Sequence, residues 1–247
     1  MGVLVDETTR VLIQGLPAQD ARKIAGQMAG FGTQVVAVVA PTDDDNESAH
    51  PVPVCPTVEE AVEAERPNAT LIAASPAGVL DAALEALARG IRLLIIATTG
   101  VSRYDASVIL DRATGAAARV IGPGSAGVIN PAGRVMVGTI ASGLGHAFAP
   151  GQVGVIARGR DVVDAIARVI HDVGLGTSTA VDIGVDAIIG TTPAALLPLF
   201  ERDRATAGVV LLDGGDAAFA DDVATVMRSR RYTKPLISFG GRRLSGS

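Results

Sequence analysis

Arg119-Val120-Ile121-Gly122-Pro123-Gly124-Ser125-Ala126-Gly127-Val128-Ile129-Asn130-Pro131 lies at the middle of the 247-residue chain and decides how the rest is organised. A short β-branched run is followed by three glycines and one proline within six residues, which ends a strand and requires turns with unusual backbone angles. Strand and helix patterns alternate on both sides. The stretch therefore predicts a hinge between two α/β halves.

The first half alternates short apolar runs with helical patterns. Thr57, followed by Glu60 three residues later, has the spacing of a helix N-cap, and Gly90 ends another helix. This order predicts a five-stranded, parallel, doubly wound domain with right-handed crossovers. The expected strands are 10–14, 34–39, 70–74, 93–97 and 119–121.

Composition limits the classes of protein that the chain can belong to. With 48% hydrophobic and 19% charged residues and a mean hydropathy of +0.38, the chain can bury a large core, and two domains fit its length. No apolar run approaches the roughly 20 residues of a membrane span, and the first residues lack a signal-peptide pattern. A net charge of −5 argues against nucleic acid. We expect a cytoplasmic protein without a membrane or nucleic-acid partner.

The single cysteine and the absence of a ligand cluster bear on redox and metal chemistry. Cys55 is the only cysteine, so no intramolecular disulfide can form, and its expected role is that of a small buried side chain. We expect no metal site.

The turn after the first strand has the position of a phosphate-binding loop. It reads Gly15-Leu16-Pro17-Ala18-Gln19-Asp20-Ala21, in which only the first glycine of a glycine-rich loop is present. Asp20 adds a negative charge at the start of the helix. A phosphate site and a plain strand-to-helix turn both remain open, with the plain turn favoured.

The turn after the second strand is strongly acidic. Asp43-Asp44-Asp45 and Glu47 would repel phosphate groups bound at this edge of the sheet. The alternatives are a solvated loop and, less favoured, a metal loop, which here lacks the glycine and spaced glutamate of a calcium site.

Motifs in a fixed order along nearly the whole chain resemble the α subunit of succinyl-CoA ligase. In the first half they are Gln14-Gly15, Phe31-Gly32-Thr33, Pro53-Val54, Thr57 to Val62, Ile121-Gly122-Pro123 and Gly127 to Pro131. In the second half they are Pro150 to Ile156, Gly174 to Thr179, Asp182-Ile183-Gly184, Asp186, Gly190-Thr191, Leu199 to Asp203 and Thr233-Lys234-Pro235.

This resemblance implies an α/β architecture of two parallel, doubly wound sheets. A Rossmann-like CoA-binding-type domain is expected over 1–123, a hinge over 124–150, and a flavodoxin-like ligase domain over 151–247, truncated before the family's phosphohistidine segment. CoA would be the cofactor, an ATP-grasp β-type subunit the partner that holds the nucleotide, and a small carboxylate the substrate. The expected cofactor-binding residues are Gly15, Leu16, Pro17, Ser75, Pro76, Thr98 and Gly100. The expected phosphate or anion-binding residues are Gly124, Ser125, Arg158, Gly159, Arg160, Gly214 and Gly215.

Departures from the family pattern shape the functional prediction. The chain has Ala157-Arg158-Gly159-Arg160 where the family has Ser-Arg-Ser-Gly, and no Gly-His-Ala-Gly segment follows Arg243. His146 and Asp213 are weak catalytic candidates, whereas His171 has the position of a helix C-terminal histidine.

These observations leave three functions open. The first is an ancillary or regulatory α-like subunit without the phosphohistidine step. The second is an active ATP-dependent acyl-CoA or acyl-acceptor ligase subunit that works through a direct acyl phosphate. The third is a stand-alone small-anion-binding module. The first is favoured.

Overall fold

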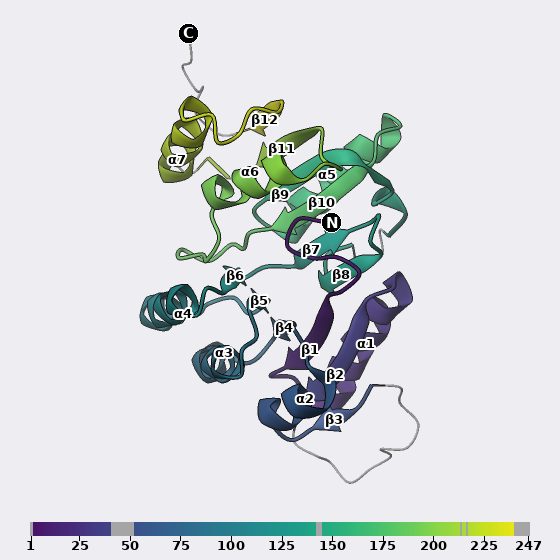
Figure 1. Cartoon of the computed structure of the whole chain (residues 1–247), viewed down its shortest axis with the longest axis vertical. Coiled ribbons are helices and arrows are strands. Elements are labelled where there is room, and N and C mark those ends of the chain that lie inside the picture. The colour runs from purple at the N-terminus through teal and green to yellow at the C-terminus, as the bar shows by residue number, and fades with distance from the viewer. Residues whose placement is uncertain (1, 41–51, 142–144, 213, 216, 240–247) are drawn as a thin grey trace.

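The computed structural model describes residues 2–40, 52–141, 145–212, 214–215 and 217–239. Two six-stranded sheets with their helices lie one above the other, and the chain passes from the lower to the upper unit near its middle (Figure 1). The two α/β halves predicted from the sequence are therefore confirmed.

The first sheet is entirely parallel, with the strand order β3-β2-β1-β4-β5-β6. This order is that of a Rossmann fold, whose ligands bind beyond the carboxyl ends of the strands. The strands are β1 (Arg10–Gln14), β2 (Gln34–Val39), β3 (Val54–Cys55), β4 (Ala69–Ile72), β5 (Leu93–Ile96) and β6 (Arg119–Ile121). The helices are α1 (Ala18–Phe31), α2 (Val58–Glu65), η2 (Pro76–Gly78), α3 (Val79–Ala88) and α4 (Arg103–Gly115).

The first half has one strand more than the sequence predicts, and its Thr57 helix cap is as predicted. The two-residue strand β3 adds a sixth strand to the five that the sequence predicts. The helix cap is confirmed, because the Glu60 amide donates to Thr57 Oγ1 at 3.2 Å and the Thr57 hydroxyl donates to Glu60 Oε1.

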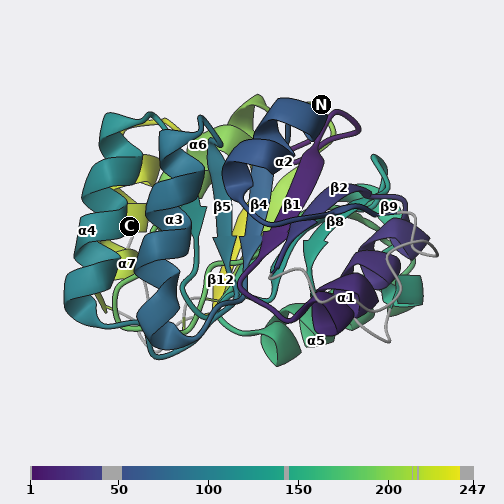
Figure 2. The same ribbon diagram turned by 90° about the horizontal axis from the view of Figure 1, so that it is seen from below.

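Alternate residues of the first sheet belong to different cores. Leu12, Leu94 and Ile96 pack with the apolar sides of α2, α3 and α4. Ile13 and Ile95 point to the other face, into a cluster that contains α1 and also the buried residues of the second half. Figure 2 shows α1 on one side of this sheet and α3 and α4 on the other. The two halves therefore share one continuous hydrophobic core.

The second sheet combines a parallel part with a hairpin, in the order β12-β11-β9-β10-β7-β8. Strands β7 and β8 pair with each other, and β7 with β10, in antiparallel fashion, whereas the other pairs are parallel. The strands are β7 (Gly127–Asn130), β8 (Val135–Gly138), β9 (Pro150–Ala157), β10 (Thr177–Asp182), β11 (Gly208–Leu212) and β12 (Leu236–Phe239). The helices are η3 (Gly145–Ala147), α5 (Arg160–Asp172), α6 (Pro193–Arg202) and α7 (Ala217–Arg228).

The stretch expected as a hinge, 124–150, contains the β7–β8 hairpin and so contributes two strands to the second sheet. Thr33, two residues after the end of α1, fixes this hairpin to the first half. Its hydroxyl donates to Met136 O at 2.8 Å and accepts from Met136 N at 2.8 Å. The hairpin is thus an integral part of the fold.

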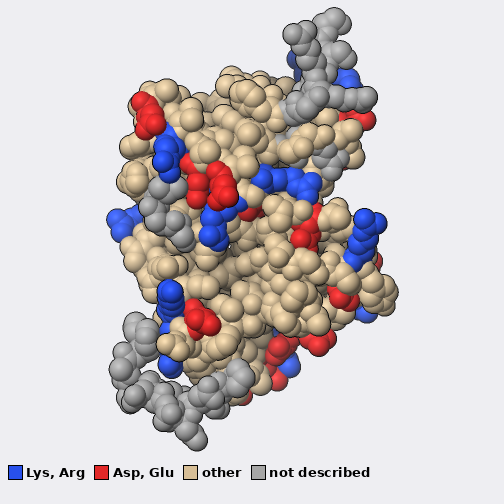
Figure 3. Space-filling model, turned by 180° about the vertical axis from the view of Figure 1, so that it is seen from behind, with Lys and Arg blue, Asp and Glu red and all other residues tan. Residues whose placement is uncertain are grey.

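Within the described residues, no helix is both long and apolar enough to cross a lipid bilayer. On the face drawn in Figure 3, basic and acidic side chains are interspersed, and no broad patch of one sign covers the visible described surface.

Candidate functional site

Three turns meet at the carboxyl edge of the first sheet. Gly15, after β1, has φ +90°, and a Cβ on it would lie 2.5 Å from atoms of Ala74, which follows β4. Thr98, after β5, donates its hydroxyl to Ala74 O at 2.6 Å. The close approach at Ala74 thus requires a glycine at position 15 and brings these turns together.

The expected cofactor-binding residues all lie in these turns. Gly15, Pro17, Ser75, Pro76 and Gly100 are exposed, and Leu16 and Thr98 are half-buried. Pro17 and Ser75 precede α1 and η2, and neither makes a side-chain cap there. The edge is therefore open to a ligand, and binding by these residues remains a prediction. The acidic turn 43–45 lies outside the described residues.

A cavity of about 420 Å³ lies next to this edge, between the two halves. Its walls come from the β5 turn, the start of the connection, the segment after β8, the N-terminal turn of α5 and the end of β10. The lining residues are Ala97, Thr99, Gly124, Ser125, Ala126, Thr139, Gly159, Arg160, Asp161, Val162, Asp182 and Val185. We call this cavity the interdomain cleft.

The connection forms a buried wall of the interdomain cleft. Gly124 N donates to Thr98 O at 2.8 Å, which joins the wall to the first half. Ser125 is buried; its hydroxyl donates to Asp182 O and accepts from Gly127 N at 2.9 Å. The hydroxyl is thus already engaged in holding the wall in place.

Asp182, at the end of β10, organises the backbone around the cleft. Its Oδ2 accepts from Ala126 N at 2.6 Å, and its Oδ1 accepts from Gly159 N at 2.7 Å and from Gly184 N at 3.1 Å. The carboxylate is buried, and three charge-assisted hydrogen bonds compensate its desolvation.

The turn Arg158–Arg160 before α5 brings two guanidinium groups to different places. Arg158 donates to the carbonyl oxygens of Gly184, Val185 and Asp186 and lies 5.6 Å from the ring centroid of Phe219. Arg160 is exposed, lines the cleft and donates to Thr139 Oγ1. Arg160, rather than Arg158, thus presents its guanidinium at the cleft.

A buried carboxyl group lies one helical turn from Arg160. Burial raises the pKa of Asp164, while the amide of Ala141 and the charges of Arg160 and Arg168 act in the opposite direction. Its Oδ1 has no hydrogen-bond partner within the described residues. The raised pKa reduces the tendency of this group to carry a negative charge beside the cleft.

The other predicted site residues lie beside or away from the cleft. A Cβ on Gly214 would lie 3.9 Å from Arg158 Cδ, so the Gly214–Gly215 turn adjoins Arg158. Asp213 lies outside the described residues.

His146, in η3, is exposed and has its ring centroid 6.3 Å from that of His171 on α5. Among the described residues, no group of three potential metal ligands comes together.

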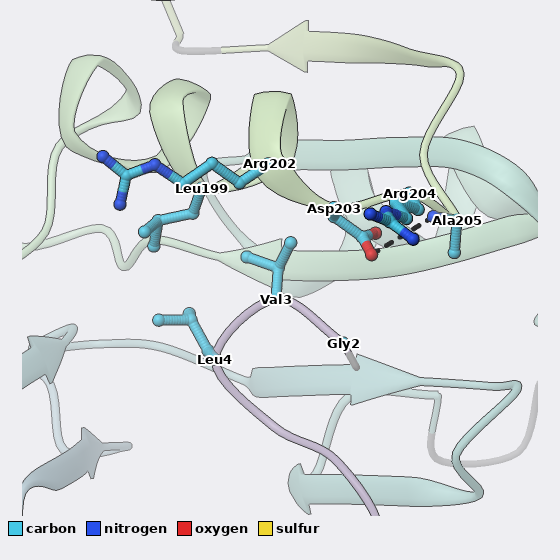
Figure 4. Close-up of a pocket in the computed structure, with 8 residues that line it drawn as sticks. All are labelled: Gly2, Val3, Leu4, Leu199, Arg202, Asp203, Arg204 and Ala205. Atoms are coloured by element: carbon cyan, nitrogen blue, oxygen red, sulfur yellow. Dashed lines mark hydrogen bonds between the residues drawn. The ribbon is translucent and has the colours of Figure 1, made fainter.

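A second cavity, of about 670 Å³, lies where the N-terminal segment meets the end of α6 (Figure 4). Val3, Leu4 and Leu199 give it an apolar wall. The Asp203 carboxylate at its rim is used locally, accepting from Ala205 N and from the Thr206 hydroxyl. This cavity is larger than the cleft, but it does not include the turns that end the parallel strands.

Sequence reasoning missed Thr139 and the bonding roles of Asp182 and Asp186. Asp182 and Asp186 belong to the motifs that carry the family resemblance, which gives their positions but not their partners. Their hydrogen bonds depend on a fold that brings together amides from positions 100, 126 and 159. Such contacts between distant residues cannot be predicted from a local sequence pattern.

The strand order of the first sheet and the turns at its edge define a Rossmann-type half joined to a second α/β half. A family model for the CoA-binding domain matches residues 6–100. The chain is 34% identical to the ADP-forming succinate–CoA ligase subunit alpha 2 of Archaeoglobus fulgidus, over 97% of this chain and 81% of that one. It is 33% identical to the malate–CoA ligase subunit alpha of Methylorubrum extorquens, over 97% and 80%. The chain belongs to the family of succinate–CoA ligase α subunits and related acid–CoA ligase α subunits.

A further relative agrees with this membership, and a solved structure shares the fold. An ADP-forming sulfoacetate–CoA ligase subunit of Bilophila wadsworthia is 30% identical over 98% of this chain and 82% of that one. The ATP citrate lyase of Methanosaeta concilii, solved with citryl-CoA, has the same fold with a TM-score of 0.82 and 21% identity. It matches 98% of this chain, which spans 42% of the lyase chain. The predicted resemblance and fold class are confirmed.

Proposed function

We propose that this chain is the CoA-binding α-type subunit of an ATP-dependent acid–CoA ligase. The observation that carries the proposal is the meeting of the Gly15, Ala74 and Thr98 turns at an open sheet edge within the matched CoA-binding domain. A β-type subunit of the ATP-grasp class supplies the nucleotide. CoA lies along the turns, with its thiol end directed toward the interdomain cleft.

The acid substrate binds in the interdomain cleft. Arg160 offers a guanidinium group there, and the described residues give it no carboxylate partner within salt-bridge distance. Guanidinium groups bind carboxylates through paired, charge-assisted hydrogen bonds. The named relatives act on succinate, malate and sulfoacetate, and a small acid of this kind fits a cavity of about 420 Å³.

We infer further that this chain acts without a phosphohistidine of its own, as an ancillary subunit. The chain has three histidines, of which His50 lies outside the described residues. The rings of His146 and His171 lie near each other by η3 and α5, and neither residue is among those that line the cleft. The alternative is an active acyl-CoA or acyl-acceptor ligase subunit that works through an acyl phosphate formed directly on the partner.

Calorimetry with CoA and desulfo-CoA tests the cofactor. We expect micromolar binding of both, since the phosphates and the adenosine part contribute most contacts in a Rossmann-type site. The absence of CoA binding to both the chain and its complex with the β-type subunit would contradict the proposal. Binding of small anions without CoA would instead favour a stand-alone anion-binding module.

A labelling experiment tests the ancillary role. The co-purified pair is incubated with ATP labelled in the γ-phosphate, and the subunits are separated under alkaline conditions that preserve phosphohistidine. We expect acid-dependent ADP release without label on this chain. Label on this chain would contradict the ancillary role and leave the CoA-binding role intact.

A further inference from the structure

The segment Asp182–Asp186 carries two carboxylates whose four oxygens all accept hydrogen bonds from the backbone. Asp182 binds the amides of Ala126, Gly159 and Gly184. Asp186 reaches into the other half and binds Gly100 N at 3.1 Å and Val101 N at 3.0 Å. We call this segment the strap. It connects the turn that precedes α5 with the turn that follows β5.

At its first-half end, the strap holds the outer part of the β5 turn. The inner part is fixed by Thr98, which bonds to Ala74 and Gly124. Gly100 is exposed, and its φ of +76° belongs to a conformation that is readily accessible to glycine. Two charge-assisted bonds to one carboxylate therefore restrict a turn that would otherwise be free to move at its exposed end.

At its second-half end, the strap is held by Arg158. The guanidinium Nε donates to Gly184 O at 3.1 Å, and Nη2 donates to Val185 O at 3.1 Å and Asp186 O at 2.8 Å. The backbone of Arg158 donates to Leu212 O at 3.1 Å, so this anchor is itself fixed to β11. The Asp186 carboxylate is thus placed by a side chain of the second half.

We propose that Asp186 is a positioning residue for CoA, which sets the Thr98–Val101 turn through the strap and Arg158. The proposal rests on the proposed function, because it assumes that CoA binds along this turn. It adds that the affinity for CoA depends on a carboxylate from the other half that does not touch the cofactor. Through Asp182, the strap also joins this turn to Gly159 at the cleft.

The direction in which CoA affinity changes when Asp186 is removed distinguishes positioning from simple electrostatics. CoA is polyanionic, so removing a nearby negative charge strengthens its binding if charge alone matters. If Asp186 positions the turn, its removal weakens CoA binding. The two explanations therefore predict opposite changes in the dissociation constant.

The test measures CoA binding by calorimetry for wild type, Asp186→Ala and Asp186→Asn. We expect the dissociation constant to rise about tenfold for Asp186→Ala, which loses both acceptors, and less for Asp186→Asn, which keeps one acceptor oxygen. Arg158→Lys keeps the charge but loses the planar guanidinium group with its several donors, and we expect it to weaken CoA binding as well. Asp105→Asn, in the first turn of α4, removes a charge from the same region and serves as the control.

Amide hydrogen exchange supplies a readout that general destabilisation would not reproduce. In Asp186→Ala we expect faster exchange in peptides that cover 98–102 and unchanged exchange in peptides that cover 177–182 of β10. Unchanged or tighter CoA binding, or faster exchange throughout the second sheet, would overturn the proposal. If wild type itself binds no CoA, the proposed function fails instead.

Discussion

At the scale of single residues, the candidate site depends on backbone conformations that few side chains permit. Gly15 combines a positive φ with a close contact to Ala74, and Asp182 binds three amides from separate segments. The glycine at position 15 was recognisable in the sequence, because it follows a strand and precedes a helix. The amides that meet at Asp182 were not, because they come from positions far apart in the chain.

Gly15→Ala is expected to destabilise the protein by about 2–4 kcal/mol, because the new Cβ is strained at φ +90° and overlaps Ala74. Urea unfolding monitored by circular dichroism measures the loss. Gly26→Ala is the matched control: Gly26 lies within α1 and has no atom within 4 Å of an added Cβ. That change should stabilise the protein by about 0.5–1 kcal/mol. Equal effects of the two substitutions would refute the close-approach explanation.

Arg160→Ala is expected to raise the KM for the acid about tenfold in the complex with its β-type subunit, with a smaller change in kcat. Arg160→Lys should recover part of this loss, since an ammonium group retains the charge without the paired donors. The assay is acid-dependent ADP release. Arg168→Ala, an exposed position further along α5, should leave the KM unchanged. An unaltered KM in Arg160→Ala would place the acid elsewhere.

At the scale of elements, strands with β-branched runs were predicted and the hairpin was missed. The β5 run is entirely apolar, the β4 run contains one polar residue, Thr70, and the structure has a buried strand at each place. Strands β7 and β8 have four residues each and lie in a glycine- and proline-rich stretch that is typical of a hinge. They form strands because β7 finds a partner in β10, more than 45 residues later. Such a pairing is set by the tertiary fold.

The segment between α7 and β12 contains a buried tyrosine with a strong pH signature. Burial, and secondarily Glu201, raises the pKa of Tyr232 to about 12, and its hydroxyl donates to Pro235 O at 3.0 Å. Since the unfolded phenol titrates near 10, its contribution to stability is complete below pH 10 and is lost between pH 10 and 12.

Tyr232→Phe should lower the free energy of unfolding by about 1 kcal/mol at neutral pH and flatten the decline above pH 10. Chemical unfolding at a series of pH values measures both effects. Tyr104, the other tyrosine, is 75% exposed, so Tyr104→Phe should reproduce the wild-type pH profile. A wild-type slope in Tyr232→Phe would assign the alkaline loss to other groups.

At the scale of the whole molecule, the shared core predicts that the two halves unfold as one unit. The larger hydrophobic cluster includes Ile13 and Ile95 from the first sheet together with Val128, Val155 and Val181 from the second. Polar contacts across the boundary, through Thr33 and Asp186, add to this shared core. The order of strand and helix patterns predicted two halves. The shared core could not be predicted, because it depends on the tertiary packing of α1 against β8.

Thr33→Val should therefore lower the stability of the entire protein. Valine keeps the shape but leaves the N–H and C=O of Met136 buried without a partner, which costs about 2–4 kcal/mol. Scanning calorimetry should show one transition that moves to lower temperature. Thr8→Val, at an exposed position, provides the comparison. Two separate transitions, in wild type or in Thr33→Val, would contradict the single folding unit.

The contact between the end of α1 and the start of β8, which we call the joint, also bears on how this protein can evolve. Gly32 packs so closely on Arg134 that a Cβ would lie 2.7 Å from its carbonyl oxygen, beside the paired hydrogen bonds of Thr33. A recombination event that exchanged one half for that of a distant relative would have to match this joint as well as the apolar core. Inheritance of the two halves as a matched pair is thus favoured by packing alone, whichever acid the cleft accepts.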